Sequence, residues 1–293
     1  MSAMTEFRFD GRDGVPVAGY RWEPEGAPRG IVQVTHGVGE HLKRYDHLAR
    51  TLTAAGFYVH GHDSRGHGQT IAPGAEPGVI GAGGWTQTIE DLDVLAGAGR
   101  AAHPGLPLIL FAHSMGSFAA QQYLLDHSDH IDAVALSGTA ALDLIEPALD
   151  LDAGLGLDLF NAPFEPGRTG FEWLSRDEHQ VDLYVADPLC GFAYDIDGMK
   201  AVFTGARQAA DPARLAAIRP GLPLYIAAGD QDPVNGQLAL VHALAGRYRS
   251  AGLTDVELHI YPGARHEILN ETNRDEVEGD LLTWLSRIAP PRA

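Results

Sequence analysis

Three residues of types that carry out covalent chemistry, Ser114, Asp232 and His266, each stand just beyond a short apolar run. A serine hydroxyl is a weak nucleophile. It needs a histidine positioned as general base and a carboxylate that orients this histidine. Catalytic groups on an open parallel sheet gather just beyond the carboxyl ends of its strands. The sequence therefore predicts a serine nucleophile with its base and acid, brought together at one edge of a sheet.

The turn around Ser114 is typical of a nucleophile elbow. The run 107–111 is apolar without a break, which indicates a strand buried on both faces, and the helical segment 118–126 follows it. A sharp strand-to-helix turn would expose Ser114 at the sheet edge, beside the free N–H groups of a helix N-terminus. The G-x-S-x-G pattern is incomplete, because Ala112 replaces the first glycine. The alternative is a turn of small residues in which Ser114 only caps the helix.

Two aspartates, Asp230 and Asp232, compete for the role of the acid within one turn. Asp232 is favoured because it lies further beyond the strand and precedes Pro233, which leaves it room to face the His266 loop. Asp230 would instead bond backbone N–H groups of the turn. For His266 the alternative is a surface histidine without a catalytic partner.

A tetrahedral intermediate needs backbone donors directed at its oxyanion. We expect one donor to be the N–H of Met115, the residue after the nucleophile. The second is expected at Val38, in the loop after residues 31–35, where Gly37 and Gly39 allow close backbone approach. The alternative is a glycine turn without this role. A phosphate cradle is not expected, since no Gly-Lys-Ser/Thr follows.

Strands and helices alternate along most of the chain. Residues 5–10 and 17–23 indicate an antiparallel hairpin, after which buried strands alternate with amphipathic helices. The expected strands are 31–35, 57–62, 107–111, 131–136, 222–228 and 256–261, and the expected helices are 45–55, 85–102, 118–126, 237–251 and 276–288. This rhythm predicts an α/β fold with a mostly parallel, doubly wound sheet and right-handed crossovers.

The rhythm breaks at residues 140–203, where helical pieces and aromatic residues occur without a convincing strand. A segment of this length is too long for a loop in a compact domain. We expect a helical cap at 140–203, inserted into an α/β core of residues 1–139 and 204–293. Its apolar and aromatic residues suggest a pocket for a hydrophobic acyl group, although such residues also form an insert's own core.

Charge and composition exclude several classes of protein. The 293-residue chain has a formal net charge of −18, which argues against nucleic acid and against a polybasic membrane anchor as partners. No signal-peptide core and no apolar run of membrane-spanning length are evident, and the single cysteine, Cys190, cannot form an internal disulfide. We expect a cytoplasmic protein that acts on a small-molecule ester and needs no cofactor or metal; homodimerisation is left open.

Several motifs together resemble the α/β-hydrolase superfamily and, within it, the monoacylglycerol lipase and lysophospholipase-like group of serine hydrolases. The matching motifs span nearly the whole chain and are His36-Gly37-Val38-Gly39-Glu40-His41 with Arg44-Tyr45, Asp63-x-Arg65-Gly66-His67-Gly68, His113-Ser114-Met115-Gly116-Ser117, Gly229-x-x-Asp232-Pro233-Val234 and Gly263-x-x-His266-Glu267. The order serine, acid, histidine is also that of α/β-hydrolases. The chain departs from the pattern at Ala112 and at Ser117.

The resemblance implies a role for each matching residue. Ser114 would be the nucleophile, Asp232 the acid and His266 the base, and the oxyanion hole would be formed by the residues already named, Val38 and Met115. It also implies that Glu40 and Arg44 line a polar pocket for the glycerol part of a substrate. The alternative is that these two residues pair only with each other or with the loop backbone. Because caps diverge most within such families, the choice of substrate does not carry over.

The predicted function is hydrolysis of carboxylic esters with a hydrophobic acyl group, such as monoacylglycerols or lysophospholipids, through an acyl-enzyme. Acyl transfer to an alcohol and cleavage of amides or peptides use the same intermediate and are the first alternatives. A metal-dependent hydrolase is another, suggested by His60, His62, Asp63 and His67. A non-catalytic protein of the same fold is a further alternative, against which the complete triad argues.

Overall fold

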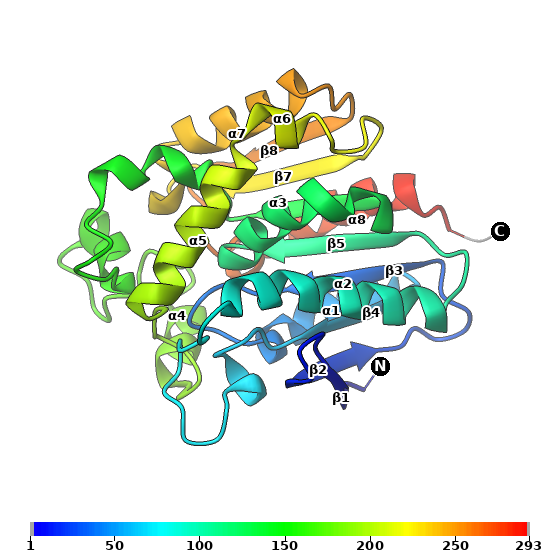
Figure 1. Ribbon diagram of the computed structural model, residues 1–293, viewed down its shortest axis with the longest axis horizontal. Helices are drawn as coiled ribbons and strands as arrows, with labels where there is room; N and C mark the ends of the chain where they lie inside the picture. The colour runs from blue at the N-terminus through cyan, green and yellow to red at the C-terminus, as the bar shows by residue number, and fades with distance from the viewer. Residues whose placement is uncertain (1–2, 292–293) are drawn as a thin grey trace.

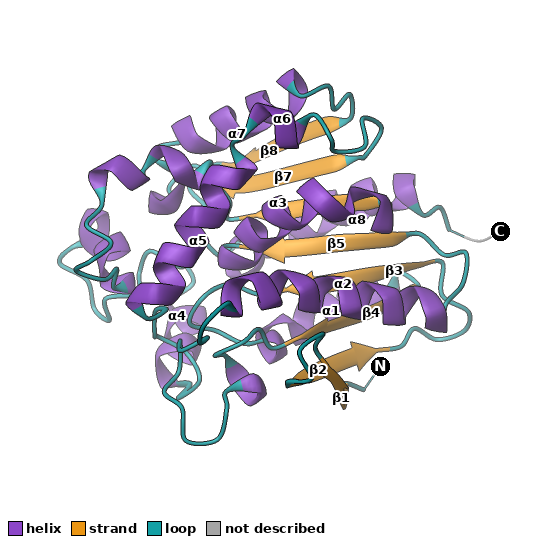
Figure 2. Cartoon of the chain, viewed as in Figure 1, coloured by secondary structure: helices purple, strands orange, loops and turns teal. Residues whose placement is uncertain are grey.

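A single eight-stranded sheet runs through the molecule, with helices on both of its faces (Figures 1 and 2). The structure is a computed structural model that describes residues 3–291. Met1 and Ser2 belong to the N-terminal segment in which we expect no signal peptide, and they lie outside the described residues. The strands are β1 Thr5–Asp10, β2 Pro16–Trp22, β3 Gly30–Thr35, β4 Phe57–His62, β5 Leu108–His113, β6 Ala133–Ser137, β7 Leu224–Gly229 and β8 Val256–Tyr261.

The strands lie in the order β1-β2-β4-β3-β5-β6-β7-β8. The β1–β2 hairpin is antiparallel and β2 runs antiparallel to β4, whereas all other neighbouring pairs are parallel. The predicted fold class, a mostly parallel α/β-hydrolase sheet, is therefore confirmed. The chain passes from β3 to β4 on one side and then crosses to β5 on the other side of β3. Such a reversal of strand order opens a crevice beyond the carboxyl ends of the strands.

Alternate residues of the central strands pack on opposite faces of the sheet. In β5, Leu108 and Leu110 belong to one core, and Ile109 and Phe111 belong to the other. Both faces are apolar because both are covered by helices, which explains why the sequence shows unbroken apolar runs rather than alternation.

The helices divide between these two cores. Apolar side chains of α1 (Asp46–Ala54) and α8 (Arg274–Ile288) pack on one face. Those of α2 (Gly84–Ala102), α3 (Met115–His127) and α7 (Ala239–Ser250) pack on the other. The helices predicted from amphipathic spacing thus lie where that spacing requires, with ends within a few residues of the prediction.

The segment between β6 and β7 contains short 3-10 turns and the helices α4 (Glu178–Ala186), α5 (Ile196–Ala209) and α6 (Pro212–Leu215). It extends beyond the carboxyl ends of the strands, at the left in Figure 1. The predicted end of the cap at residue 203 lies inside α5. This helix continues to Ala209 because Val202, Phe203 and Ala209 are buried in the core that α3 also lines.

Within residues 3–291, we find no helix that combines the length and the apolar character needed to cross a membrane.

Candidate active site

Ser114 lies in a strained turn between β5 and α3. Its φ of 51° and ψ of −123° are unusual for a residue other than glycine, and its N–H is held by the Ser137 carbonyl at 2.9 Å. Gly116 makes the turn possible, since a Cβ atom there would come within 2.5 Å of the His36 carbonyl oxygen. Ala112, the departure from the pattern, is buried inside β5 and precedes the turn. The sequence therefore folds locally into an elbow that tolerates this alanine.

The structure brings Ser114, His266 and Asp232 into one hydrogen-bonded chain. His266 Nε2 lies 2.8 Å from Ser114 Oγ, and His266 Nδ1 lies 2.9 Å from Asp232 Oδ2. With a proton on Nδ1, His266 donates to the carboxylate and accepts from the serine hydroxyl. The other Asp232 oxygen accepts the Val234 N–H at 2.8 Å, which orients the carboxylate. This geometry can remove a proton from Ser114 and stabilise the resulting imidazolium.

Asp230 lies in the same turn but faces away from His266. Its Oδ1 accepts the Gly263 N–H at 2.7 Å and the Gln231 side-chain amide at 3.1 Å. It thereby holds the loop that leads to His266 in place. Asp230 therefore accepts a backbone N–H, which is the alternative role that the sequence analysis gave it.

Two opposing effects act on the His266 imidazole, which is almost fully buried. Burial by itself would lower its pKa. The Asp232 carboxylate opposes burial by charge and by hydrogen bonding, with help from Glu267 and Glu40, and the result is a pKa raised above the ordinary 6.5. The negative groups around His266 therefore favour the imidazolium that forms when it takes a proton.

The loop after β3 approaches Ser114 closely. A Cβ atom on Gly37 would lie 3.0 Å from the Ser114 Cβ, so only glycine fits without displacement. The Gly37 N–H donates to Glu40 at 2.6 Å and the Gly39 N–H donates to His67 Nε2 at 3.1 Å, so both amides build the loop itself. Val38, between them, lines a cavity together with Ser114 and Met115. The structure thus places both predicted oxyanion residues beside the nucleophile.

Glu40 and Arg44 belong to a buried ionic network that includes Glu267, the residue after His266. Arg44 donates to Glu40 at 2.6 Å and to both carboxylate oxygens of Glu267 at 2.6 and 2.7 Å. Tyr45 donates its hydroxyl proton to Glu40 at 2.8 Å. Burial would raise the pKa of Glu40, but the Arg44 guanidinium overcomes it and lowers this pKa to about 2. Glu40 and Arg44 are therefore paired with each other, and Arg44 has a further partner, Glu267, that neither sequence-based interpretation included.

Glu267 is the member of this network to which sequence reasoning assigned no role. It is buried, and it holds the Arg44 guanidinium in a bidentate pair. Its position directly after His266 was a usable signal, because it puts a carboxylate beside the base. Its pairing with Arg44 could not be predicted from the local sequence, because Arg44 lies 223 positions earlier in the chain.

Ser114 also lines a cavity that is partly open to solvent. Apolar side chains dominate its wall, and most of them come from the segment between β6 and β7. The lining residues are Val38, Ser114, Met115, Phe118, Leu142, Ile145, Leu149, Leu155, Leu157, Leu159, Phe160, Trp173, Tyr194, Met199, Val202, Phe203 and Val234. A hydrophobic chain bound in this cavity would have its end at the serine hydroxyl.

Two of the residues that suggested a metal-dependent hydrolase, Asp63 and His67, bond other protein groups. The Asp63 carboxylate accepts the Tyr20 hydroxyl at 2.7 Å and the backbone N–H groups of Leu42 and Gln69 at 2.9 and 2.8 Å. His67 accepts the Gly39 N–H. His60 and His62 are buried in β4. Asp63 and His67 thereby connect the loops after β3 and β4.

Comparison with known proteins gives consistent results. Residues 26–273 match the family model described as serine aminopeptidase, S33. The chain is 33% identical to a monoacylglycerol lipase of Mycolicibacterium smegmatis, over 97% of this chain and 98% of the relative. It is 30% identical to a monoglyceride lipase of Rattus norvegicus, over 92% and 86%. A carboxyl esterase from Bacillus coagulans, solved with glycerol, superposes with a TM-score of 0.87 at 29% identity, over 99% of this chain and 100% of that chain.

Proposed function

Because the chain belongs to the serine aminopeptidase S33 family of α/β hydrolases, in the monoacylglycerol lipase-like group, we propose that it hydrolyses monoacylglycerols and similar esters of a hydrophobic acid. The chain is a carboxylic ester hydrolase, since it matches lipase and esterase relatives over nearly their full length. One observation carries the choice of a hydrophobic acid: the apolar cavity opens on the Ser114 hydroxyl.

In the proposed mechanism, His266 Nε2 takes the hydroxyl proton while Ser114 Oγ bonds to the ester carbonyl carbon. The N–H groups of Met115 and Val38 hold the oxyanion. The imidazolium, stabilised by Asp232, then gives its proton to the alcohol oxygen, and the bond between this oxygen and the carbonyl carbon breaks. Water attacks the acyl-enzyme with His266 again as base, which releases the acid and restores Ser114.

We assign different parts of the substrate to the two sides of Ser114. The cap segment, residues 140–203, would enclose the acyl chain, since it supplies most of the cavity wall. Glu40 and Arg44 would form the polar side towards the alcohol. Because their charged groups are already paired with each other and with Glu267, they would act mainly by holding the loop that carries Val38.

Cleavage of peptides from a free amino terminus is the competing reaction within the family. An aminopeptidase would need a carboxylate to receive the substrate ammonium group. None of the described residues that line the cavity is an aspartate or a glutamate. The cavity therefore favours an uncharged acyl group over an amino acid.

A substrate panel tests this proposal. Monoacylglycerols, lysophospholipids, aryl esters and aminoacyl amides of graded length should be compared by kcat/KM, with Ser114→Ala as the inactive reference. We expect long-chain monoacylglycerols to exceed acetyl esters by about 100-fold, because each buried methylene adds to transition-state binding. Faster cleavage of the aminoacyl amides would overturn the proposal. Ester products formed in the presence of added alcohols would identify acyl transfer instead.

A further inference from the structure

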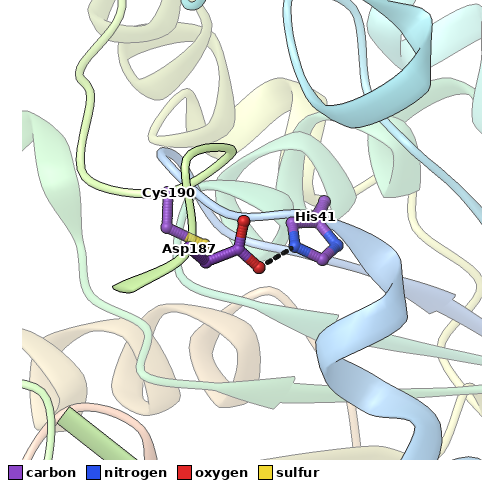
Figure 3. A group of neighbouring side chains, drawn as sticks. All are labelled: His41, Asp187 and Cys190. Carbon is purple, nitrogen blue, oxygen red and sulfur yellow. Dashed lines mark hydrogen bonds and ion pairs between the residues drawn. The ribbon is translucent and has the colours of Figure 1, made fainter. Parts of the chain in front are cut away.

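Three side chains able to bind a metal ion converge beside the loop that carries Val38. His41 lies in this loop, and Asp187 and Cys190 lie in the segment after α4. A ring nitrogen of His41, a carboxylate oxygen of Asp187 and the Cys190 sulfur all lie within 4.8 Å of one another (Figure 3). We propose that these side chains bind one thiophilic divalent cation, of which Zn²⁺ is the best match, with water as the fourth ligand.

The two ligands from the cap are held by one tight turn. The Cys190 N–H donates to the Asp187 carbonyl at 3.0 Å, which brings residues three positions apart to the same side. The Leu189 N–H donates to Asp187 Oδ1 at 2.9 Å, so this carboxylate has a fixed orientation. Its other oxygen, Oδ2, lies 2.9 Å from His41 Nε2. The site therefore has oriented ligands, as metal sites with bonded carboxylates do.

The ligand types and spacing suit a tetrahedral ion. Nitrogen, oxygen and sulfur ligands on zinc stand about 3.2 to 3.7 Å apart. A thiolate with an imidazole selects zinc or cobalt over magnesium and calcium, which prefer oxygen ligands alone. The Asp187 side chain is 30% exposed, which gives an ion and its water access to the site.

The charges around the cluster favour a cation. Arg44, a neighbouring positive group, is already paired with Glu40 and Glu267. Binding of the ion would release the thiol proton to solvent, and the thiolate and the Asp187 carboxylate would then balance the two positive charges.

The position of the cluster gives the ion a consequence for the enzyme. Helix α4 and the segment after it already contact the loop, because the Tyr184 hydroxyl and the Gly191 N–H donate to the Gly39 carbonyl at 2.8 and 3.0 Å. An ion between His41 and the Asp187–Cys190 turn would fasten the cap to the core, three residues from Val38. We expect occupancy to raise the melting temperature and to slow turnover by limiting movement of the cap.

A second cluster provides a control. Ring nitrogens of His127 and His130 and a carboxylate oxygen of Asp93 also lie within 4.8 Å of one another. There, however, Arg12 already bonds Asp93 and Glu90, each at 2.6 Å. This guanidinium occupies the position of a cation and neutralises the carboxylates. The site also lacks a thiolate, so the two clusters can be told apart spectroscopically.

Titration of the reduced protein with Co²⁺, followed by displacement with Zn²⁺, tests the proposal. We expect one Co²⁺ per chain, with a thiolate-to-cobalt charge-transfer band in the near ultraviolet. Cys190→Ser should remove the band and weaken Zn²⁺ binding by about 100-fold, and Asp187→Asn should weaken it by about tenfold. His130→Ala should change neither. Using the Ser114→Ala background makes the result independent of the proposed function.

Two outcomes would overturn the proposal. One is the absence of a charge-transfer band at saturating Co²⁺ in the chain that retains Cys190. The other is Zn²⁺ affinity that survives Cys190→Ser but is lost in His130→Ala, which would place the ion at the second cluster.

Discussion

Two regions of opposite character adjoin the Ser114–His266 pair. In the first, Glu40, Arg44 and Glu267 form a buried ionic network whose charged atoms have partners at 2.6–2.7 Å. In the second, the cavity wall is almost entirely apolar. Directional bonds between groups on the core hold the first region, and packing of the cap holds the second. The network is therefore suited to a fixed electrostatic task, whereas the cavity can change its shape with few penalties.

The comparison predicts that the polar side controls the rate and the apolar side controls the choice of substrate.

The largest expected effect is a loss of kcat that distinguishes two aspartates of one turn. Asp232→Asn should lower kcat by about 10⁴-fold, because the amide would favour the wrong tautomer of His266. Asp230→Asn, which keeps an acceptor for the Gly263 N–H, should lower it by less than about tenfold. Steady-state kinetics on one ester measures both. A larger loss of kcat in Asp230→Asn than in Asp232→Asn would show that Asp230, and not Asp232, is the acid.

The apolar side is tested by narrowing the cavity. Ile145→Trp adds volume to the wall, so kcat/KM for a long-chain monoacylglycerol should fall by about 30-fold. Its kcat/KM for an acetyl ester should stay within about threefold, since a short acyl group does not reach the new side chain. Leu144→Trp is the matched control, because Leu144 is its neighbour but is 49% exposed and does not line the cavity. Equal losses on both esters would contradict a cavity that binds the acyl chain.

The polar side is tested at Glu267, with a smaller effect on the rate. His266 acts as base only when neutral, so kcat/KM should rise with pH, with a midpoint above the ordinary 6.5. Glu267→Gln removes a negative charge that helps to raise the pKa of His266. The midpoint should therefore move to lower pH, and kcat at high pH should fall by less than about tenfold. An unchanged or higher midpoint would show that this network does not act on the base.

The same substitution should also lower the free energy of unfolding by about 3 kcal/mol, because it breaks a buried bidentate pair with Arg44. Glu257→Gln is the control, since Glu257 pairs with Arg287 at the surface and is 40% exposed. It should change the free energy by less than about 0.5 kcal/mol. Urea unfolding of the two variants gives both values.

Local sequence was sufficient to predict the strands and helices and the candidate catalytic side chains that follow the strands. Mainly apolar runs predicted the central strands, because a sheet covered on both faces leaves few polar positions in its centre. Since parallel strands end at one edge, Ser114, Asp232 and His266 could be expected to meet before any distance was known. The position of Asp232, further past the strand end and before Pro233, favoured it over Asp230, which bonds the Gly263 N–H instead.

Contacts between distant segments could be decided only by the tertiary structure. The pairing of Arg44 with Glu267, the extension of α5 past residue 203 and the meeting of His41 with Asp187 all join segments that have no pattern in common. The cavity, too, could be found only from the tertiary structure. Its wall comes from several segments, and their apolar residues could equally have packed on one another. Local periodicity determined where the nucleophile and its partners stand. Long-range packing of the cap decided what surrounds them, because that packing depends on contacts that no single stretch of chain contains.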